Sequence, residues 1–460
     1  MTKKHLPEQT SRSETREKLV IPASDAAKAA ADVAHSLRSH GHQAYFVGGC
    51  VRDLLRGEDP KDYDVATDAH PDAVTKLFPG SLVVGAQFGV VGVLEAGHRI
   101  EVATFRNDGL YSDARRPDRV HYSRDPREDV LRRDFTINGL LLDPETGELL
   151  DFVEGRRDIE RRIVRTVGNP EKRFEEDRLR MLRAVRFAAC FGYNIDPETF
   201  VALHRLSPKI ATVSAERVRD ELLRILASGH ARRGFELLDT SGLLPKILPE
   251  IAAMQGVEQP PQFHPEGDVW THTLLMLESL QKDCSPTLAM GVLLHDVGKP
   301  PTFRIAPDRI RFDNHVMVGT RMAEEIAKRL RFSQDQTAQV SALVENHLRF
   351  RDVHEMREST LKRFLRLPKF EEHLELHRLD CLSSHRHLEN YEFVRSKLLE
   401  HTEEAIRPRP LITGDDLIQM GYLPGPRFKE ILEHTEDAQL EGRITSHEEA
   451  LQFVRERFEP

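Results

Sequence analysis

Two different spacings of apolar residues divide the chain. Residues 26–41, AAKAAADVAHSLRSHG, have helical spacing and stop at a glycine, whereas QAYFVGG (43–49) and DYDVATD (62–68) alternate as strands do. Residues 81–108 contain two or three further apolar runs joined by glycine turns. This first part of the chain is therefore expected to form a mixed sheet with helices.

The strand pattern ends near residue 155. In TINGLLLDPETGELLDFVEG (136–155) the turn DPETGE joins two apolar runs, and nearly everything from 156 to 460 then has helical period. Proline-bearing joints such as EQPPQFHPEGD (258–268) and RPRPLITGDD (407–416) interrupt it. The predicted fold class is α+β, a mixed head followed by an all-α body.

Length and composition limit the class of protein. A chain of 460 residues exceeds one ordinary hydrophobic core, so two or more domains are expected. The 39% hydrophobic and 31% charged content is typical of a soluble protein. The sequence contains neither an apolar run long enough to span a membrane nor an apolar signal segment, and this pattern predicts a cytoplasmic location. The four cysteines are far apart, so their spacing indicates neither a disulfide framework nor a thiolate zinc site.

Charge is segregated although the net value is −9. Arginines concentrate in RRDIERRIVR (156–165) and RLRMLRAVR (178–186), and acidic residues concentrate near the C-terminus. Such a pattern alone is more often a solvated helix face than a track for RNA.

One short stretch, residues 45–68, combines features that suit nucleotide chemistry. In an extended strand Asp62 and Asp64 point to the same side, where two oxygen ligands can hold magnesium. Gly48 and Gly49 let the backbone approach a polyphosphate, and Arg52 can neutralise its charge. A D-x-D dipeptide alone is usually a solvated strand end, but the combination is much less easily accidental.

Three segments resemble the signature motifs of the bacterial-type (class II) tRNA nucleotidyltransferase and poly(A) polymerase family: GGCVRDLLRGEDPKDYDVAT, RRDFTINGL (132–140) and EEDRLRMLRAVRFA (175–188). The resemblance covers about residues 40 to 235 and implies a polymerase-beta-like nucleotidyltransferase head. It also implies two-metal nucleotidyl transfer with Mg²⁺ as cofactor, Asp62 and Asp64 being ligands.

The resemblance assigns further residues to the nucleotide. It implies a third carboxylate on a neighbouring strand, for which Glu101 is the candidate and a solvent-facing glutamate the alternative. Arg106 would face triphosphate or primer, whereas Arg133 and Asp134 would contact the ribose, although capping of a helix by Asp134 is also compatible. Arg217, in SAERVRDELLRIL (214–226), would help to shape the pocket.

The motif at 175–188 implies a template made of amino acids. On one helix Asp177 and Arg180 would share a face away from the apolar stripe, where an exposed ion pair is the ordinary interpretation. The family resemblance instead implies that Asp177 and Arg180 pair with the edge of cytosine or adenine, and Arg183 belongs to the same nucleotide-binding motif. A flexible loop between Arg106 and Arg132 would help to switch specificity from C to A.

The helical body carries a second constellation. His295 and Asp296 are adjacent within an apolar helix, and histidine with carboxylate suits a divalent ion. Together with His272 and Asp380 they resemble the phosphohydrolase superfamily named for its His-Asp pair, in which His315 and His347 match additional ligands of some members. The metal's identity stays open, an inherited structural domain is the alternative, and Lys299 is a candidate for positioning a phosphate.

These observations predict five segments: a mobile leader (1–25), the nucleotidyltransferase head (26–158), a helical neck and body (159–255), an HD-type metal domain (256–390) and a helical tail (391–460). The function implied is template-independent addition of CCA, or part of it, to tRNA from CTP and ATP, with phosphohydrolase activity in the HD domain. Poly(A) polymerase or A-only addition is the first alternative. An HD phosphohydrolase with a nucleotide-sensing head is the second.

Overall fold

The computed structural model describes residues 18–83, 89–108, 120–262 and 264–459. Part of the segment expected to form the specificity loop, 109–119, and most of the expected leader, 1–17, lie outside these residues. The chain forms two compact units, Met1–Val213 with Thr240–Leu243 and Ser214–Asp239 with Leu244–Pro460. The boundary at 213 falls inside the segment predicted as neck and body, and the five-part division stays a prediction.

The first unit is built on one mixed sheet of seven strands. Within this sheet, as the described residues form it, the β2–β5 pair is parallel and the other pairs are antiparallel. Across the sheet the strands are β3 (Leu82–Val83), β4 (Val90–Glu95), β5 (His98–Thr104), β2 (Asp64–Thr67), β1 (Ala44–Val47), β8 (Leu140–Leu142) and β9 (Leu149–Asp151). The DPETGE turn joins β8 to β9, as the sequence predicts.

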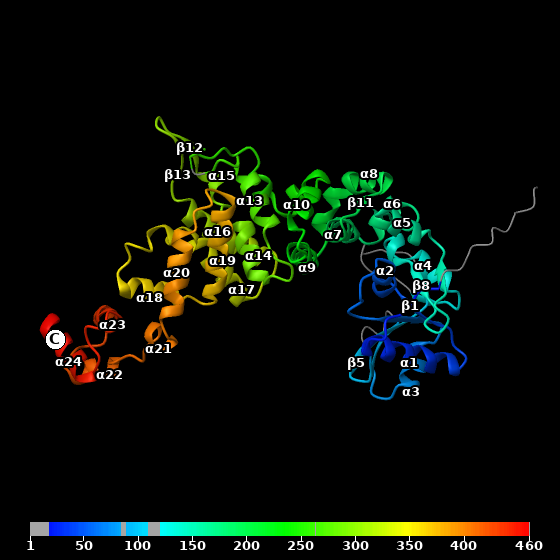
Figure 1. Cartoon of the computed structure of the whole chain (residues 1–460), viewed down its shortest axis with the longest axis horizontal. Coiled ribbons are helices and arrows are strands. Elements are labelled where there is room, and N and C mark those ends of the chain that lie inside the picture. Colours follow the sequence, from blue (N-terminus) through cyan, green and yellow to red (C-terminus); the bar gives the residue numbers. More distant parts are fainter. Residues whose placement is uncertain (1–17, 84–88, 109–119, 263, 460) are drawn as a thin grey trace, which may run out of the picture. The chain divides into compact units, whose positions relative to one another are not determined.

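Apolar residues on the strands explain how the sheet is covered. Helix α1 (Asp25–Ser39) contacts β1, β2, β4 and β5, and it buries a face of alanine, valine and leucine against them (Figure 1). Phe46 of β1 packs against Tyr63, with 5.2 Å between ring centroids. The buried Val47, Ala66 and Leu141 join Phe105 in one core cluster, so β1, β2 and β8 are fixed from within.

Helices and short strands complete the first unit. These are α2 (Gly49–Leu55), α3 (Pro71–Leu77), β6 (Arg106–Asp108), β7 (Val120–Tyr122), α4 (Pro126–Leu131), η2 (Thr136–Asn138), α5 (Gly155–Arg161), β10 (Ile163–Val164), α6 (Pro170–Glu176), α7 (Arg180–Phe191), β11 (Asn194–Ile195), α8 (Pro197–Leu206) and η3 (Ser207–Thr212). The pair β10–β11 shows that strand structure does not end at residue 155. The sequence did not predict these strands, because two residues per strand are too few to give a periodic pattern.

The second unit is helical apart from the hairpin β12 (Phe303–Ile305) and β13 (Ile310–Phe312). Its helices are α9 (Ala215–Leu226), α10 (Ala231–Thr240), α11 (Leu244–Ile247), α12 (Pro249–Ala252), α13 (Val269–Glu278), α14 (Pro286–Leu294), α15 (Lys299–Thr302), α16 (His315–Arg329), α17 (Gln334–Asn346), η4 (His347–Asp352), α18 (Glu358–Leu365), α19 (Phe370–Ser383), α20 (Glu389–Glu400), α21 (Glu403–Ile406), α22 (Gly414–Gln419), α23 (Pro426–Leu440) and α24 (His447–Arg457). The sheet-bearing head and the helical part confirm the predicted fold class.

Helix α14 is the centre of this unit. Every residue from Thr287 to Leu294 is buried, as expected for a helix that is apolar on all sides. It contacts α9, α13, α17 and α19, and Figure 1 shows α13, α14, α16, α17 and α19 gathered in one bundle. Because the chain leaves α14 directly into His295 and Asp296, these polar side chains begin inside the bundle.

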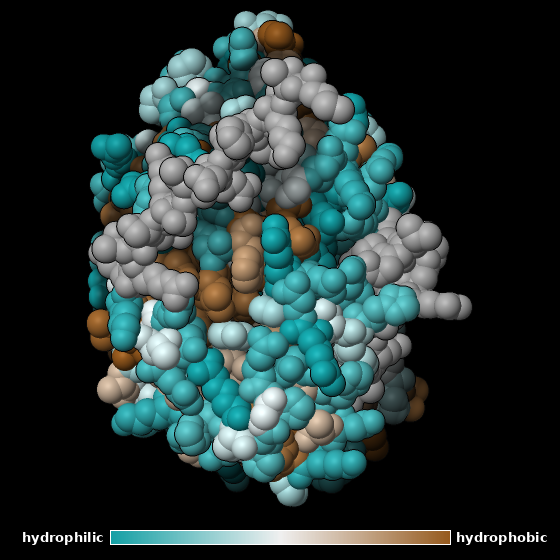
Figure 2. Space-filling model, turned by 90° about the vertical axis from the view of Figure 1, so that its right-hand side faces the viewer, coloured by the Kyte–Doolittle hydropathy of each residue, from teal (hydrophilic) through white to brown (hydrophobic). Residues whose placement is uncertain are grey.

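Within the described residues, none of the helices has the length and apolarity needed to cross a membrane. The face in Figure 2 is largely hydrophilic, with apolar surface gathered in one hollow near its middle.

Candidate functional site

Two of the three carboxylates predicted in the head lie on adjacent strands, and the third lies just before one of them. Asp64 is the first residue of β2, and Asp62 precedes it by two positions. Tyr63 and Val65 are buried, whereas Asp62 is exposed, so the side chains alternate as expected for extended chain. Glu101 of β5 is the register partner of Asp64 in the parallel pair, which puts both side chains on the same face of the sheet.

Burial and the repulsion among the three carboxylates make this face of the sheet suitable for a cation. Burial, together with the negative charges of Glu101 and Asp62, raises the pKa of Asp64 to about 6 against the opposing effect of Arg133. Oxygen ligands are those that Mg²⁺ prefers, and a bound cation would relieve the repulsion. The residues present therefore fit a magnesium site.

The glycine turn lies against an arginine. Gly48 has a φ of +74° and precedes α2, which begins at Gly49. A side chain at Gly48 would have its Cβ 3.5 Å from Nη1 of Arg133, and one at Gly49 would lie 3.6 Å from Nη2 of Arg52. At these distances a Cβ would make ordinary van der Waals contacts, so it is the positive φ of Gly48, and not crowding, that favours glycine at this turn.

Arg52 is largely engaged by the protein itself. The side chain donates to Oδ1 of Asn138 at 2.7 Å and to Oδ1 of Asp53 at 2.9 Å. Its guanidinium lies 4.6 Å from the ring centroid of Phe191 on α7. These contacts connect α2 to η2 and α7 and leave Arg52 only 9% exposed.

Asp134 is the acceptor at the centre of a partly buried network. Phe135 N and Asn138 Nδ2 donate to Oδ1 at 2.8 and 3.0 Å, whereas Nε and Nη2 of Arg183 donate to Oδ2 at 2.8 and 2.6 Å. Although burial acts in the opposite direction, Arg183 and Asn138 hold the pKa of Asp134 well below its usual range. Four donors fill the carboxylate's acceptor capacity, so a ribose hydroxyl would have to replace one of them.

The structure corrects the single helix expected over 175–188. Helix α6 ends at Glu176, Asp177 is extended with φ −144° and ψ 106°, and α7 begins at Arg180. Oδ1 of Asp177 accepts from Leu179 N at 3.1 Å in the turn between the two helices, whereas the N-cap of α7 is Leu179, which has no side-chain cap bond. The two residues therefore do not share one helical face, because this local bond between side chain and backbone competes with helix continuation.

Arg180 is also buried instead of exposed. Its side chain donates to Glu176 Oε2 at 2.8 Å and to the carbonyl oxygens of Arg173 and Arg132 at 3.1 and 3.2 Å. The interpretation of Arg180 as part of an exposed ion pair with Asp177 is therefore wrong.

The remaining predicted residues lie further along the chain. Arg106 is the first residue of β6 and pairs in register with Tyr122, and Arg217 lies on α9 in the second unit.

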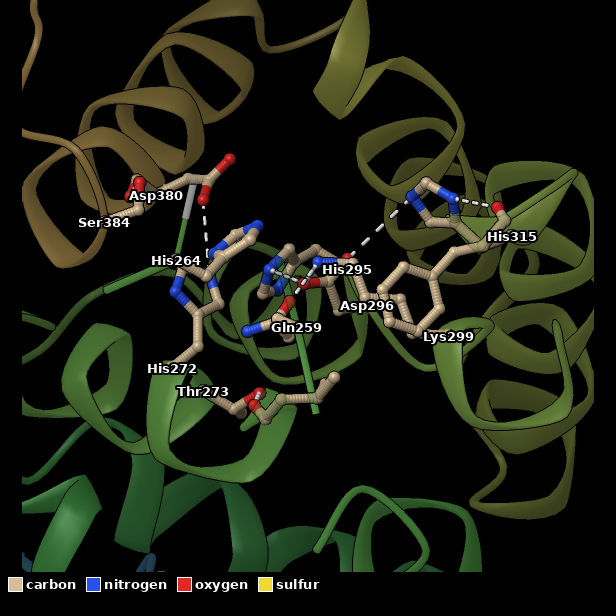
Figure 3. Close-up of polar contacts among 12 residues, drawn as sticks. Gln259, His264, His272, Thr273, His295, Asp296, Lys299, His315, Asp380 and Ser384 are labelled. Atoms are coloured by element: carbon tan, nitrogen blue, oxygen red, sulfur yellow. Dashed lines mark hydrogen bonds and ion pairs between the residues drawn. The ribbon is translucent and has the colours of Figure 1, made fainter. Parts of the chain in front are cut away.

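In the second unit the predicted histidines and aspartates converge from α13, the end of α14, α16, the junction of α17 with η4, and α19. Figure 3 labels all of them except His347. His272 Nε2 lies 3.2 Å from Asp380 Oδ1, and His295 Nε2 lies 3.1 Å from Asp296 Oδ2. The other Asp296 oxygen is 4.0 Å from His315 Nε2 and 3.9 Å from His347 Nε2. Two ligand groups made up of predicted residues, His272–His295–Asp296 and Asp296–His315–His347, have donor atoms within 4.8 Å of one another, and a third group joins His272 to His264 and Glu266.

The four histidines share one orientation. Nδ1 of His272 is bonded to Glu266, and Nδ1 of the other three to backbone carbonyls of Val292, Phe312 and Val344. Each Nε2 is buried and makes no hydrogen bond of acceptable geometry, although carboxylate oxygens lie 3.2 Å from that of His272 and 3.1 Å from that of His295. Buried orphan nitrogens are costly, whereas this arrangement is what metal-ligating histidines adopt. The donor set fits a divalent transition ion.

Charge compensation at this site depends on Asp296. Lys299 Nζ lies 2.7 Å from its Oδ2. Burial opposes ionisation, but His295 and Lys299 hold the pKa of Asp296 well below its usual range. Burial lowers the pKa of His347 to about 4, so its ring is neutral and available to a metal near neutral pH.

A pocket of about 400 Å³ opens beside these ligands. Its wall includes Lys299 and three arginines, Arg309, Arg311 and Arg351, which suit an anionic ligand. Apolar lining comes from Ile310, Phe312 and Leu348.

Three residues that the sequence predictions missed complete the surroundings. Gln259 binds Lys299, while His264 and Glu266 adjoin His272. All three come from a proline-bearing stretch interpreted only as a joint. The available signal was a histidine and a glutamate eight and six residues before His272.

The fold and the two clusters define a nucleotidyltransferase-type head followed by a His-Asp helical domain. Family models match in the same order: the poly A polymerase head domain over 44–165, the probable RNA- and SrmB-binding site of polymerase A over 192–255, and the HD domain over 268–379.

Similar proteins carry consistent names. A CCA-adding enzyme of Geobacillus stearothermophilus is 46% identical over 211 residues, 46% of this chain and 52% of that protein. One of Lactobacillus helveticus is 39% identical over 259 residues, 55% of this chain and 64% of that protein. The chain thus spans about half the length of the first of these curated relatives.

Solved structures extend the likeness along the chain. The Bacillus stearothermophilus CCA-adding enzyme in complex with CTP has a TM-score of 0.73 and 26% identity, covering 94% of this chain and 98% of that one. The Thermotoga maritima enzyme complexed with tRNA has a TM-score of 0.55 at 20% identity, over 93% and 94% of the two chains, and supports the fold alone. The three domain models, the curated relatives and the structure with CTP confirm the resemblance to the bacterial-type tRNA nucleotidyltransferase and poly(A) polymerase family.

Proposed function

We propose that the protein is a tRNA nucleotidyltransferase that adds CCA, or part of it, to tRNA 3′ ends from CTP and ATP. The observation that carries this proposal is the register of Asp64 with Glu101, which brings two carboxylates to one face of the sheet beside Asp62. The relatives named CCA-adding enzymes support the substrate class. A cytoplasmic location stays a prediction.

In this proposal Asp62, Asp64 and Glu101 hold two magnesium ions. The ions, when bound, would stabilise the leaving pyrophosphate and favour deprotonation of the attacking 3′-hydroxyl. Gly48 and Gly49 provide the close backbone approach to the triphosphate, with Arg133 beside them. Arg106 would face triphosphate or primer, and Arg52 acts through the elements it connects.

Nucleotide selection is assigned to the second group of residues. The partly buried Asp134–Arg183 pair orients Arg183 for the nucleotide, and Arg133 contacts the ribose. Asp177 and Arg180 would select cytosine and adenine, with Asp177 the more accessible of the two. Arg217 would support the pocket, and the helical unit would bind tRNA by shape and phosphate contacts.

The test uses tRNA transcripts that end before CCA, after C and after CC, supplied with CTP, ATP or both and with Mg²⁺. Stepwise completion that stops after the final A is the expected result, read from product length. Addition of A alone would assign the chain to the A-adding or polyadenylating alternatives. No incorporation into any transcript would contradict the proposal and favour a nucleotide-sensing head.

A second activity is proposed for the HD cluster because four buried Nε2 atoms point at two adjoining carboxylates. We propose phosphohydrolysis of phosphorylated or cyclic-phosphate RNA ends, with His272, His295, Asp296 and Asp380 as metal ligands and His315 and His347 as additional candidates. Release of phosphate from a 3′-phosphorylated transcript, dependent on added Mn²⁺, Co²⁺ or Ni²⁺, tests it. An absence of release with every ion would contradict it.

A further inference from the structure

A loop preceding α13 reaches the HD cluster at two points. Gln259 Oε1 accepts from Lys299 Nζ at 2.6 Å, and Lys299 in turn binds Asp296. Seven residues later, Oε1 of Glu266 lies 2.7 Å from His272 Nδ1. The loop thus contacts Lys299, which is bonded to the candidate ligand Asp296, and the candidate ligand His272 itself. None of the ligands predicted from the sequence lies in this loop.

The carboxylate of Glu266 is largely buried and lies between two histidines. Its side chain is 7% exposed, and one oxygen, Oε1, serves both His272 Nδ1 and His264 Nδ1, the latter at 2.9 Å. The other oxygen, Oε2, is buried without a partner. A buried carboxylate is costly unless the groups around it need its charge, and here two imidazoles surround it.

The geometry at His272 gives this carboxylate a specific effect. A carboxylate on Nδ1 fixes the tautomer with the proton on Nδ1, holds the ring in one rotation and makes Nε2 a stronger donor to a cation. His272 Nε2 faces Asp380 Oδ1 at 3.2 Å, so the metal-facing atom and the carboxylate-facing atom lie at opposite sides of the ring. The other three candidate histidines have only neutral backbone carbonyls on Nδ1.

We propose that Glu266 is a positioning residue that makes His272 the anchoring ligand of the HD-domain cation. The inference rests on the proposed metal site of the HD cluster, and it assigns the loop before α13 a function in metal retention. In ligand strength, His272 then exceeds His295, His315 and His347.

The test measures Co²⁺ binding to the full chain by visible absorption, which reports nitrogen ligation, in excess Mg²⁺ to occupy the head. Glu266→Gln keeps the side-chain shape and removes the charge, and a 10- to 100-fold weaker Co²⁺ affinity, on the order found for such partners, is expected. Glu258→Gln, the same change at an exposed position of the same loop, is the matched control and should bind as the wild type does.

A merely structural role is separated by two further readouts. Thermal unfolding of the metal-free variants reports packing, whereas the Co²⁺ spectrum reports the ligand field of His272. If Glu266→Gln does not fold, Glu266→Asp retains the charge at a longer distance and should bind Co²⁺ with intermediate affinity. Wild-type affinity in either folded variant, or an equal loss in Glu258→Gln, overturns the inference.

The outcome is independent of the proposed hydrolysis. Wild-type protein that binds Co²⁺ tightly but releases no phosphate contradicts the phosphohydrolase and leaves the affinity comparison intact. Wild-type protein that binds no Co²⁺ overturns the inference about Glu266, whereas the phosphohydrolase is contradicted only if no ion supports release.

Discussion

The two carboxylate-bearing sites differ in how far the protein has compensated its own charges. In the head, Asp64 lies beside Glu101 and Asp62, and its pKa is raised to about 6. In the HD cluster, Lys299 and His295 hold the pKa of Asp296 well below its usual range, and all four histidines have Nδ1 engaged. The head is therefore suited to cations that arrive with a nucleotide, and the HD cluster to a resident ion.

The largest expected effect comes from removing the head carboxylates. Asp62→Ala combined with Asp64→Ala should reduce nucleotide incorporation by about 10³-fold or more, because the charge that holds the metal is lost. Co²⁺ binding by the HD cluster should be unchanged, which is what the comparison requires. Sizing of extended transcripts and cobalt absorption measure the two sites separately.

The matched control for that experiment is Asp59→Ala, an exposed carboxylate in the same segment. It should extend transcripts at the wild-type rate. Retained incorporation in the double variant would remove Asp62 and Asp64 from the metal site.

A complementary change affects the other site. Asp296→Asn should lower Co²⁺ affinity by about 100-fold, because the residue belongs to both ligand groups, and leave incorporation intact. It also leaves Lys299 buried without its counter-charge, which should cost about 3 kcal/mol in the free energy of unfolding. Cobalt titration and denaturant unfolding test this, with the exposed Asp308→Asn as control.

The two regions also differ in how much the sequence revealed. The D-x-D alternation and the glycine turn follow from local rules, so Asp62, Asp64 and Gly48 could be located directly. The break between α6 and α7 could not, because it depends on one local bond that Leu179 N donates to the Asp177 side chain. Nor could the loop residue Glu266, whose contact with His272 exists only once α13 has packed.

A smaller effect concerns selectivity in the head. Asp177→Ala should change the ratio of CTP to ATP incorporation by about tenfold, the range of one discriminating base contact, with little loss in total extension. Single-nucleotide addition to transcripts ending before CCA and after CC measures the ratio. Glu175→Ala, exposed and two residues earlier, should leave it unchanged. An unaltered ratio in Asp177→Ala would remove this residue from base selection.

The smallest expected effect concerns a buried histidine of the helical unit that is not assigned to the metal site. It tests whether burial alone accounts for the lowered pKa of this histidine. His373 lies on α19 with Asp380, is 1% exposed, and has both ring nitrogens without partners, yet it belongs to neither ligand group. Burial lowers the pKa of His373 to about 4, below its ordinary value of 6.5.

Because the unfolded chain takes up this proton first, His373 contributes stability that is present above pH 6.5 and lost as pH falls towards 4. The loss is at most about 3 kcal/mol. His373→Leu should flatten the acid side of the stability profile without changing Co²⁺ affinity, as measured by denaturant unfolding from pH 4 to 7. A weaker Co²⁺ complex in this variant would show that the metal-binding network extends beyond the six residues assigned to it. The distinction between the assigned histidine ligands, whose Nδ1 atoms are bonded, and an ordinary buried histidine such as His373 would then be wrong.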